Sequence, residues 1–468
     1  MEELLSFIRS QRIDLQNASA LARLQLPESL HSLVLSRIDM VGESPRRTLK
    51  VASVIGRVFR APSLIGVYPE LGGLDEVREH LRALGTLDIV NLEQEAEQTY
   101  LFKHVVTQEV AYESMPFAFR SMLHERVGGY IETTEADAIE RNLDLLAHHY
   151  WHSTNVAKKR EYLTRAGDAA QASYANAAAI GYFERLLPLT EQGARVDVLL
   201  KLGKVLELVG NWQRAAQVDS EALALSEQLG EPGRHAACET ALAEVARKQG
   251  HFDEAKERLA RAAREYQSVG DEGGMAGVLH FAGNVATQRG EFAKSVENYE
   301  ASLEIRKRTG DKAGMASLLS NLGIIAEGRG DIEGSRGFHE RALALRTEIG
   351  DRRGIGNSTT NLGMIAYLQK HYAEARDWFQ KSMLLNREVG DSWMVALCHH
   401  NLGNASRGLD DGRTARQHYA ASLRTFRDYD DSWRSRSCSR TSASLPRSRV
   451  MRRPRSCSSA PPTRCARP

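Results

Sequence analysis

Features that would place this chain in a membrane or in an oxidising compartment are scarce or missing. The 468 residues include five cysteines, which lack metal-ligand spacing, and three of them follow Ser432. No run of 18 apolar residues occurs, and the first residues do not combine a basic stretch with a long apolar one. We therefore expect no disulfides, no membrane span and no signal peptide, and predict a cytoplasmic protein.

Motifs for nucleotide chemistry and catalysis are missing as well. No G-x-x-x-x-G-K-[ST] loop occurs, and Gly203-Lys204-Val205 lacks both the first glycine and the hydroxyl of such a loop. No acidic cyclase metal site and no Ser/His/Asp or Cys/His arrangement stands out. His148 and His152 share one helix face, but two histidines without a third ligand favour helix packing over a metal site. The sequence predicts no enzyme, no metal and no cofactor.

The formal net charge of +2 conceals two parts of opposite sign. Residues 432–468 hold ten arginines, no lysine and no acid, and removing those ten leaves −8 for residues 1–431. The acidic part gives no electrostatic reason for a nucleic-acid partner. The tail, residues 431–468, can be interpreted as a basic segment for nucleic acid or membrane surfaces, as disorder, or as a frameshift. We favour the frameshift, because Asp431-Ser432-Trp433 copies Asp391-Ser392-Trp393 and another repeat is due there.

What the sequence does contain is a 40-residue unit that recurs in register from about residue 190 to 430. Within each unit, two apolar stripes at helical spacing are separated by glycine or polar residues, which predicts a pair of helices. Such a pair buries its apolar face by stacking on its neighbours. Each unit has a glycine suited to a left-handed helix end, an acid suited to cap the next helix, and a small residue where helices approach closely. These are Gly230, Gly270, Gly310, Gly350 and Gly390; Glu231, Asp271, Asp311, Asp351 and Asp391; and Ala243, Gly283, Gly323, Gly363 and Gly403.

One position of the unit holds Asn-Leu-Gly in three successive copies, and an aromatic follows the turn in two: Asn321-Leu322-Gly323, Asn361-Leu362-Gly363 and Asn401-Leu402-Gly403, with Phe252 and Phe292. With these residues the unit resembles the tetratricopeptide repeat. The usual period is about 34 residues, so the longer period here implies longer helices. The family implies an α-solenoid of about six helix pairs over residues 191–430, with a protein or peptide as its partner.

Residues 26–135 predict a small domain ahead of the repeats. Helices are expected from Pro27 to about 39 and over about 45–55, 74–84 and 117–132, and strand-like runs over 86–92 and 99–102. Three helices followed by a hairpin indicate a winged helix with a two-stranded wing. With a helical lead at residues 1–25 and a helical connector at 136–190, the predicted fold class is all-α apart from the wing.

A second resemblance covers roughly residues 1–190. It is carried by segments such as Ala52-Ser53-Val54-Ile55-Gly56-Arg57-Val58-Phe59 and Leu146-Ala147-His148-His149-Tyr150. They are similar to the region behind the nucleotide-binding module of large bacterial signalling ATPases, which often carry an adenylate or guanylate cyclase domain or a LuxR-type helix-turn-helix. Since the phosphate loop is missing, we expect the back half of such a protein, either truncated or read from an internal Met.

These observations predict a non-catalytic regulatory segment that binds a protein or peptide. Two alternatives stay open. One is a subunit that serves ATP-dependent signalling with a separate nucleotide-binding chain, and the other is a DNA-binding transcriptional regulator, which the weakly basic surroundings of the winged helix do not favour. The last repeat would lack a polar capping helix, which predicts self-association, and no membrane partner is expected.

The candidate ligand contacts are asparagines on the concave side of the solenoid. Asn321, Asn361 and Asn401 occupy one position of successive first helices and are expected to form a ladder, with Asn284 and Asn404 about one turn away. A carboxamide both donates and accepts, so it matches the backbone of an extended peptide, and the family commonly clamps its ligand main chain there. The neighbours expected to set side-chain preference are His280, Ser320, Thr360 and His400. The alternative is that these asparagines bond to a neighbouring helix and fix the stacking.

Overall fold

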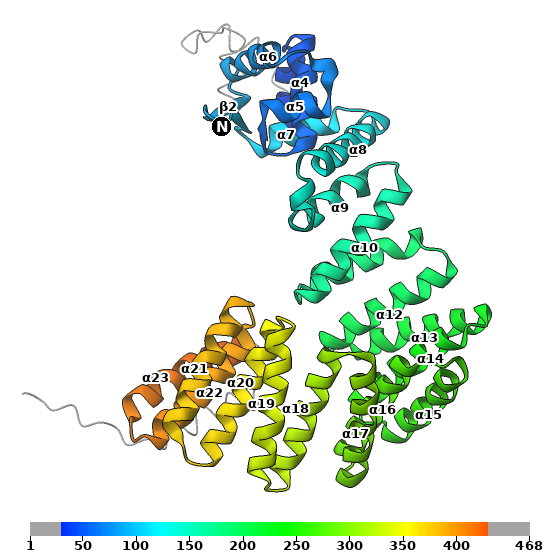
Figure 1. The fold of residues 1–468 in the computed structure, drawn as a ribbon. Helices are drawn as coiled ribbons and strands as arrows, with labels where there is room; N and C mark the ends of the chain where they lie inside the picture. The colour runs from blue at the N-terminus through cyan, green and yellow to red at the C-terminus, as the bar shows by residue number, and fades with distance from the viewer. Residues whose placement is uncertain (1–29, 429–468) are drawn as a thin grey trace, which may run out of the picture. The chain divides into compact units, whose positions relative to one another are not determined.

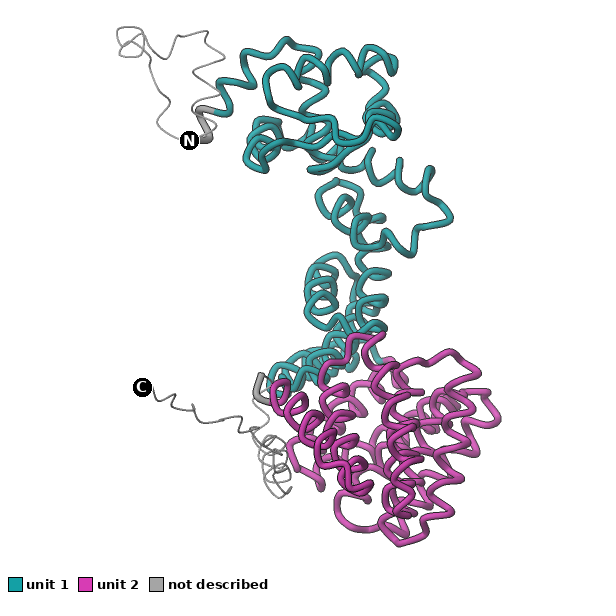
Figure 2. The backbone as a smooth tube through the Cα atoms, turned by 90° about the vertical axis from the view of Figure 1, so that its left-hand side faces the viewer, with its two compact units in different colours: residues 1–230 teal, residues 231–468 magenta. Residues whose placement is uncertain are grey.

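The computed structural model describes residues 30–428, and the predicted helical lead and basic tail lie outside them. The chain divides into two compact units, residues 1–230 and 231–468, which Figure 2 shows in different colours. This division falls after the first helix pair of the repeats. The described part is helical apart from one small sheet, as predicted (Figure 1).

The first unit begins with a small domain of helices and a sheet. The three strands are antiparallel in the order β1-β3-β2; Val58 pairs with Leu101, and Val90 with Phe102. Phe59 and Phe102 pack against each other with ring centroids 5.5 Å apart. The elements are α3 (Leu30–Asp39), α4 (Glu43–Ile55), β1 (Val58–Arg60), α5 (Ala61–Val67), η1 (Pro69–Leu71), α6 (Leu74–Thr86), β2 (Val90–Gln94) and β3 (Thr99–Phe102).

The winged-helix prediction needs three corrections. The sheet has three strands instead of two, because β1 pairs with β3; a strand of three residues is too short to show an alternating pattern. The strand predicted over residues 86–92 begins later than expected: Thr86 is the last residue of α6, and β2 begins at Val90. Helix α5, which has seven residues and contains Pro62 and Gly66, was not predicted. Pro62 lies in its first turn, where the missing N–H leaves no hydrogen bond unmade.

Helices make up the rest of the first unit. Close packing depends on glycine at several places; for example, a Cβ on Gly128 would lie 2.7 Å from the Tyr150 ring, and one on Gly167 would lie 2.6 Å from the Phe183 ring. The elements are α7 (Val105–Glu113), α8 (Phe117–Thr134), η2 (Ala136–Arg141), α9 (Leu143–His152), α10 (Val156–Ala172), α11 (Asn176–Leu186), η3 (Leu187–Leu189), α12 (Gln192–Leu208) and α13 (Trp212–Leu229).

The second unit is a stack of antiparallel helix pairs, and Figure 1 shows consecutive helices side by side. With α12 and α13, the described residues hold the six pairs that the period predicts. The helices are α14 (Pro232–Lys248), α15 (Phe252–Val269), α16 (Glu272–Gln288), α17 (Phe292–Thr309), α18 (Lys312–Gly328), α19 (Ile332–Glu348), α20 (Arg352–Leu368), α21 (Tyr372–Glu388), α22 (Ser392–Gly408) and α23 (Gly412–Asp428).

The repeated glycines and aspartates have the roles that the sequence predicts, whereas Glu231 precedes α14 without a side-chain cap hydrogen bond. Gly270 and Gly310 end α15 and α17 with φ of +71° and +72°, a left-handed conformation that favours glycine. The side chains of Asp271 and Asp311 then accept a hydrogen bond from the backbone N–H groups of Gly274 and Gly314, each 2.8 Å long. These bonds satisfy N–H groups of the first turn that have no partner within the helix.

The repeated small residue makes room for a ring in the partner helix. A Cβ placed on Gly283 would come within 2.4 Å of the Tyr299 ring, and one on Gly363 within 2.6 Å of the Phe379 ring. The close approach that the sequence predicts at this position is therefore confirmed, and its cause is a buried ring sixteen residues later in the chain.

Candidate functional site

The predicted contact residues lie on the first helix of four successive pairs. His280 and Asn284 are on α16, Ser320 and Asn321 on α18, and Thr360 and Asn361 on α20, while α22 carries His400, Asn401 and Asn404. The repeat period gives residues 321, 361 and 401 the same position in their helices. Their surroundings nevertheless differ from one repeat to the next.

Asn321 links two repeats. Its Nδ2 lies 3.0 Å from His280 Nε2 and donates to Asn284 Oδ1 at 3.3 Å. The hydroxyl of Tyr299 on α17 donates to the same Asn284 oxygen at 2.7 Å, and the Tyr299 ring meets the His280 ring edge-on with centroids 5.9 Å apart. Four half-buried or buried side chains from three helices thus form one polar cluster, which we call the amide cluster (His280, Asn284, Tyr299 and Asn321).

Three members of this cluster have counterparts three repeats later. The hydroxyl of Tyr419 donates to Asn404 Oδ1 at 2.8 Å, and the rings of His400 and Tyr419 have centroids 5.8 Å apart. His400, Asn404 and Tyr419 are each 120 residues after His280, Asn284 and Tyr299. The histidines and asparagines were predicted as contacts from the sequence, and both tyrosines were not. Their position in the period, shared with Phe379, was the signal that could have found them.

Asn361 has a different partner. Its Nδ2 lies 3.4 Å from Nδ1 of His339, which belongs to the position that Tyr299 holds in the preceding repeat. His339 is fully buried, and burial together with the nearby charge of Arg346 lowers its pKa to about 4. The imidazole beside Asn361 is therefore neutral at physiological pH.

Three of the predicted contact residues have side chains that are buried between helices. Asn401 is 3% exposed, Thr360 7% and Ser320 8%. Ser320 Oγ donates to the Ala316 carbonyl at 3.1 Å, and Thr360 Oγ1 lies 2.7 Å from Ser382 Oγ on α21. The Nδ2 of Asn401 is buried and has no hydrogen-bond partner among the described residues. In this conformation these three side chains offer little surface to a ligand, whereas Asn284, Asn321, Asn361 and Asn404 are half-exposed.

The histidines near residue 150 form a separate group in the first unit. His148 and His152 share a helix face as expected, with ring centroids 4.9 Å apart, and both rings contact His124 of α8. Among the residues that the structure describes, no three His, Cys, Asp or Glu side chains are arranged to hold a metal ion. None of the helices between Leu30 and Asp428 combines the length and the apolar character that crossing a membrane requires.

Comparison with protein families identifies the repeats in the helix pairs from α12 to α23. The tetratricopeptide repeat family matches residues 195–268, 274–348 and 354–428. These residues are tetratricopeptide repeats. Protein binding is the role typical of this repeat, whose stacked units create extended concave surfaces. The sequence matches no curated protein.

Solved structures with a similar fold include a signal transduction ATPase. A signal transduction ATPase with numerous domains and a tetratricopeptide repeat sensor, from Pyrococcus horikoshii, has a TM-score of 0.51 at 12% identity, over 94% of this chain and 71% of that chain. A Rap protein complexed with Competence and Sporulation Factor has a TM-score of 0.45 at 14% identity, over 66% and 93%. BtubC from P. vanneervenii has a TM-score of 0.43 at 18% identity, over 47% and 92%. At these identities the likeness concerns the fold, and the narrower assignment to cyclase-associated or LuxR-type proteins stays a prediction.

Proposed function

We propose that this chain is a regulatory sensor of the signalling-ATPase type, whose repeats bind an extended peptide through amide side chains of their first helices. The observation that carries the proposal is the geometry of Asn321. Both of its hydrogen bonds use the amide nitrogen, which leaves the amide oxygen as an acceptor. Asn361 also uses its nitrogen, toward His339. Oxygens at the same position of α18 and α20 suit the N–H groups of an extended main chain.

The amide cluster also limits what kind of ligand fits. Its groups are amides, a phenol and an imidazole, and His339, which lies beside Asn361, is neutral because burial lowers its pKa to about 4. Uncharged donors and acceptors recognise a peptide backbone better than they recognise a charged side chain. We therefore expect the affinity for a peptide at this surface to depend weakly on salt.

The test uses three asparagines that occupy one position but differ in exposure. The double variant Asn321→Ala with Asn361→Ala removes the two half-exposed amides, and Asn401→Ala, which is buried, is the matched control. Capture of peptides from a random library and thermal melting are measured for both. We expect the double variant to lose capture while its melting stays close to that of the parent, and Asn401→Ala to keep capture. Undiminished capture by the double variant, or a collapse of its melting, would return Asn321 and Asn361 to a purely structural role.

A second candidate is a subunit that serves ATP-dependent signalling through a separate nucleotide-binding chain. The fold likeness to the Pyrococcus horikoshii ATPase over 94% of this chain favours it. Because the sequence has no phosphate-binding loop, we expect calorimetry to detect no saturable ATP binding by this chain alone. Under this candidate the chain co-purifies with a separately expressed nucleotide-binding module and changes its ATP hydrolysis rate; an unchanged rate would count against it.

A further inference from the structure

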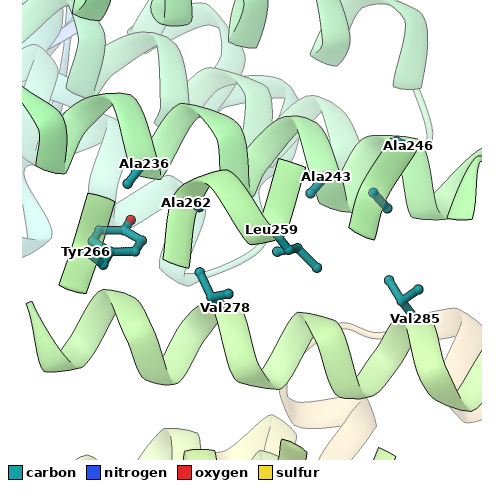
Figure 3. Close-up of a cluster of buried hydrophobic side chains, with 9 residues drawn as sticks. Ala236, Ala243, Ala246, Leu259, Ala262, Tyr266, Val278 and Val285 are labelled. Carbon is teal, nitrogen blue, oxygen red and sulfur yellow. The ribbon is translucent and has the colours of Figure 1, made fainter. Parts of the chain in front are cut away.

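A cavity of about 220 Å³ lies where α15, α16 and α17 meet, within the second unit. Its lining is mainly apolar: Leu259, Val278, Val285 and Ala286 are each at most 5% exposed. Figure 3 shows Leu259 of α15 directed toward α16, in the space between Val278 and Val285. Ala260, Ala263 and Ala282 complete the apolar lining.

The cavity exists because two large side chains are missing from one junction between repeats. Residue 263 is alanine, where the equivalent positions of the other pairs hold Leu223, Leu303, Leu343, Met383 and Leu423. Residue 282 is also alanine, where the other pairs hold Leu202, Leu242, Leu322, Leu362 and Leu402. At the next junction Leu303 and Leu322 belong to one buried cluster, and Ala263 and Ala282 both line this cavity. Two alanines from different repeats, each at a position where the other pairs hold a larger side chain, therefore leave one common cavity.

The mouth of the cavity is positively charged. Lys256 of α15 and Lys294 of α17 line it, are exposed, and form no ion pair among the described residues. Arg289 and Glu291 also line it. The Arg289 guanidinium pairs with Glu291 and with Asp253, which is not part of the lining, so these three residues carry a net charge of −1 and the two lysines bring the total at the mouth to +1. The two lysines remain as cations beside an apolar recess.

We propose that this cavity is a docking pocket for one apolar side chain, of leucine or phenylalanine size, in a peptide segment whose flanking residues are acidic. A cavity of about 150 Å³ already holds benzene, and sites for whole small molecules usually measure about 300–1,000 Å³. A volume of about 220 Å³ therefore suits a single anchoring side chain. The acidic flanks follow from Lys256 and Lys294, because opposite charge at the rim sets the choice of partner and the association rate.

This pocket is separate from the amide cluster. Ala282 and Asn284 are both on α16 but point about 200° apart around the helix axis, since successive residues are separated by about 100°. The inference therefore does not rest on the proposed function, and either one can fail alone.

The experiment uses the full chain and fluorescent heptapeptides in which a central Phe has three acidic residues on each side. The pocket-filling variant Ala263→Leu with Ala282→Leu installs the residues that the other repeats carry, so it is expected to fold and to melt higher than the parent. We expect saturable binding of the acidic Phe peptide to the parent and at least about tenfold weaker binding to the filled variant, because the anchor loses its burial. Comparison peptides carry Ala in place of Phe, or Lys in place of the acids.

Charge is tested with a second pair of variants. Lys256→Glu with Lys294→Glu should weaken binding of the acidic peptide about tenfold at low salt and less at high salt. Lys307→Glu with Lys312→Glu changes the net charge equally at exposed lysines outside the pocket and should leave binding unchanged. Absence of saturable binding, equal affinity of the filled variant, or equal affinity of the lysine-flanked peptide would overturn the proposal. So would octanoate binding in the pocket while the acidic peptide does not bind.

Discussion

The Nδ1 atoms of His124 and His149 lie 2.9 Å apart between α8 and α9. One nitrogen must donate and the other accept, so the pair holds together only while at least one ring is neutral. The Nε2 of His124 lies 3.0 Å from the Tyr112 hydroxyl, and His149 is 1% exposed. Burial, reinforced by the neighbouring His148 and His152, lowers the pKa of both rings to about 3.

This pair predicts that the first unit loses stability in acid. An unfolded histidine takes up a proton near pH 6.5, whereas these two stay neutral in the folded chain until about pH 3. Between those pH values the unfolded state binds more protons, so stability falls as the pH is lowered. Hydrogen exchange of residues 105–152, corrected for its intrinsic pH dependence, should show more opening at pH 5 than at pH 7.

The variant His149→Phe provides the control for this effect. It removes one titrating ring, and we expect a smaller difference in exchange between pH 5 and pH 7. An unchanged difference would mean that the acid sensitivity of residues 105–152 arises elsewhere.

Asp219 predicts a change of opposite sign in the first helix pair. It is 2% exposed, and burial and the nearby Glu207 raise its pKa to about 7. The folded state therefore binds a proton that the unfolded state releases above about pH 4, so this contribution to stability is present below pH 4 and lost by about pH 7. The equivalent positions of the later repeats hold Leu259, Tyr299, His339, Phe379 and Tyr419.

We expect Asp219→Leu to raise the melting temperature, and to raise it more at pH 8 than at pH 5. Leucine supplies the apolar group that Leu259 supplies in the next repeat, and it removes a buried carboxylate. The control Asp219→Asn removes the charge but keeps a polar group, so it should abolish the pH dependence and give a smaller gain. A lower melting temperature for Asp219→Leu at pH 8 would contradict this account.

The repeat period allowed most of the second unit to be predicted from the sequence. Gly310 and Asp311 mark a helix end and a cap by their chemistry alone, and the structure confirms both roles. Short elements escaped prediction: β1 has three residues, and the seven-residue α5 contains both proline and glycine. Periodic patterns need several turns or several alternations to be recognised.

The candidate site was harder to predict, because a position in a repeat does not determine its contacts. Asn321, Asn361 and Asn401 are equivalent in sequence, yet the first bonds to His280 and Asn284, the second lies beside His339, and the third is buried. The partner residue lies on another helix, and its identity changes from one repeat to the next. The cavity beside α16 escaped for a related reason: it depends on Ala263 and Ala282, side chains that are small where the pattern expects large ones.

Two glycines offer a direct test of how backbone conformation limits the turns between helix pairs. Gly310 has φ of +72°, whereas Gly277 lies within α16 and a Cβ added there would meet no atom within 4 Å. Gly310→Ala should destabilise the second unit by about 1–2 kcal/mol, the cost of a left-handed conformation for a residue with a Cβ. Gly277→Ala should stabilise it by about 0.5–1 kcal/mol. Urea unfolding measures both, and equal effects of the two changes would contradict the assigned role of Gly310.

The last prediction concerns the glycine beneath a ring. A Cβ on Gly363 would lie 2.6 Å from the Phe379 ring, so Gly363→Ala should destabilise the protein by about 1–3 kcal/mol through overpacking. Phe379→Leu alone should also destabilise it, because it leaves a space beside Gly363. The double variant reproduces Ala243 and Leu259, which belong to one buried cluster in the second repeat.

If the small residue and the ring are matched to each other, the double variant is more stable than the sum of the two single changes predicts. A double-mutant cycle by urea unfolding should give a favourable coupling of about 1 kcal/mol or more, in the range found for residues in contact. The same two substitutions at positions in different repeats, Gly363→Ala with Phe426→Leu, serve as the control and should combine additively. Additive behaviour of Gly363→Ala with Phe379→Leu would show that the glycine has another reason to be small.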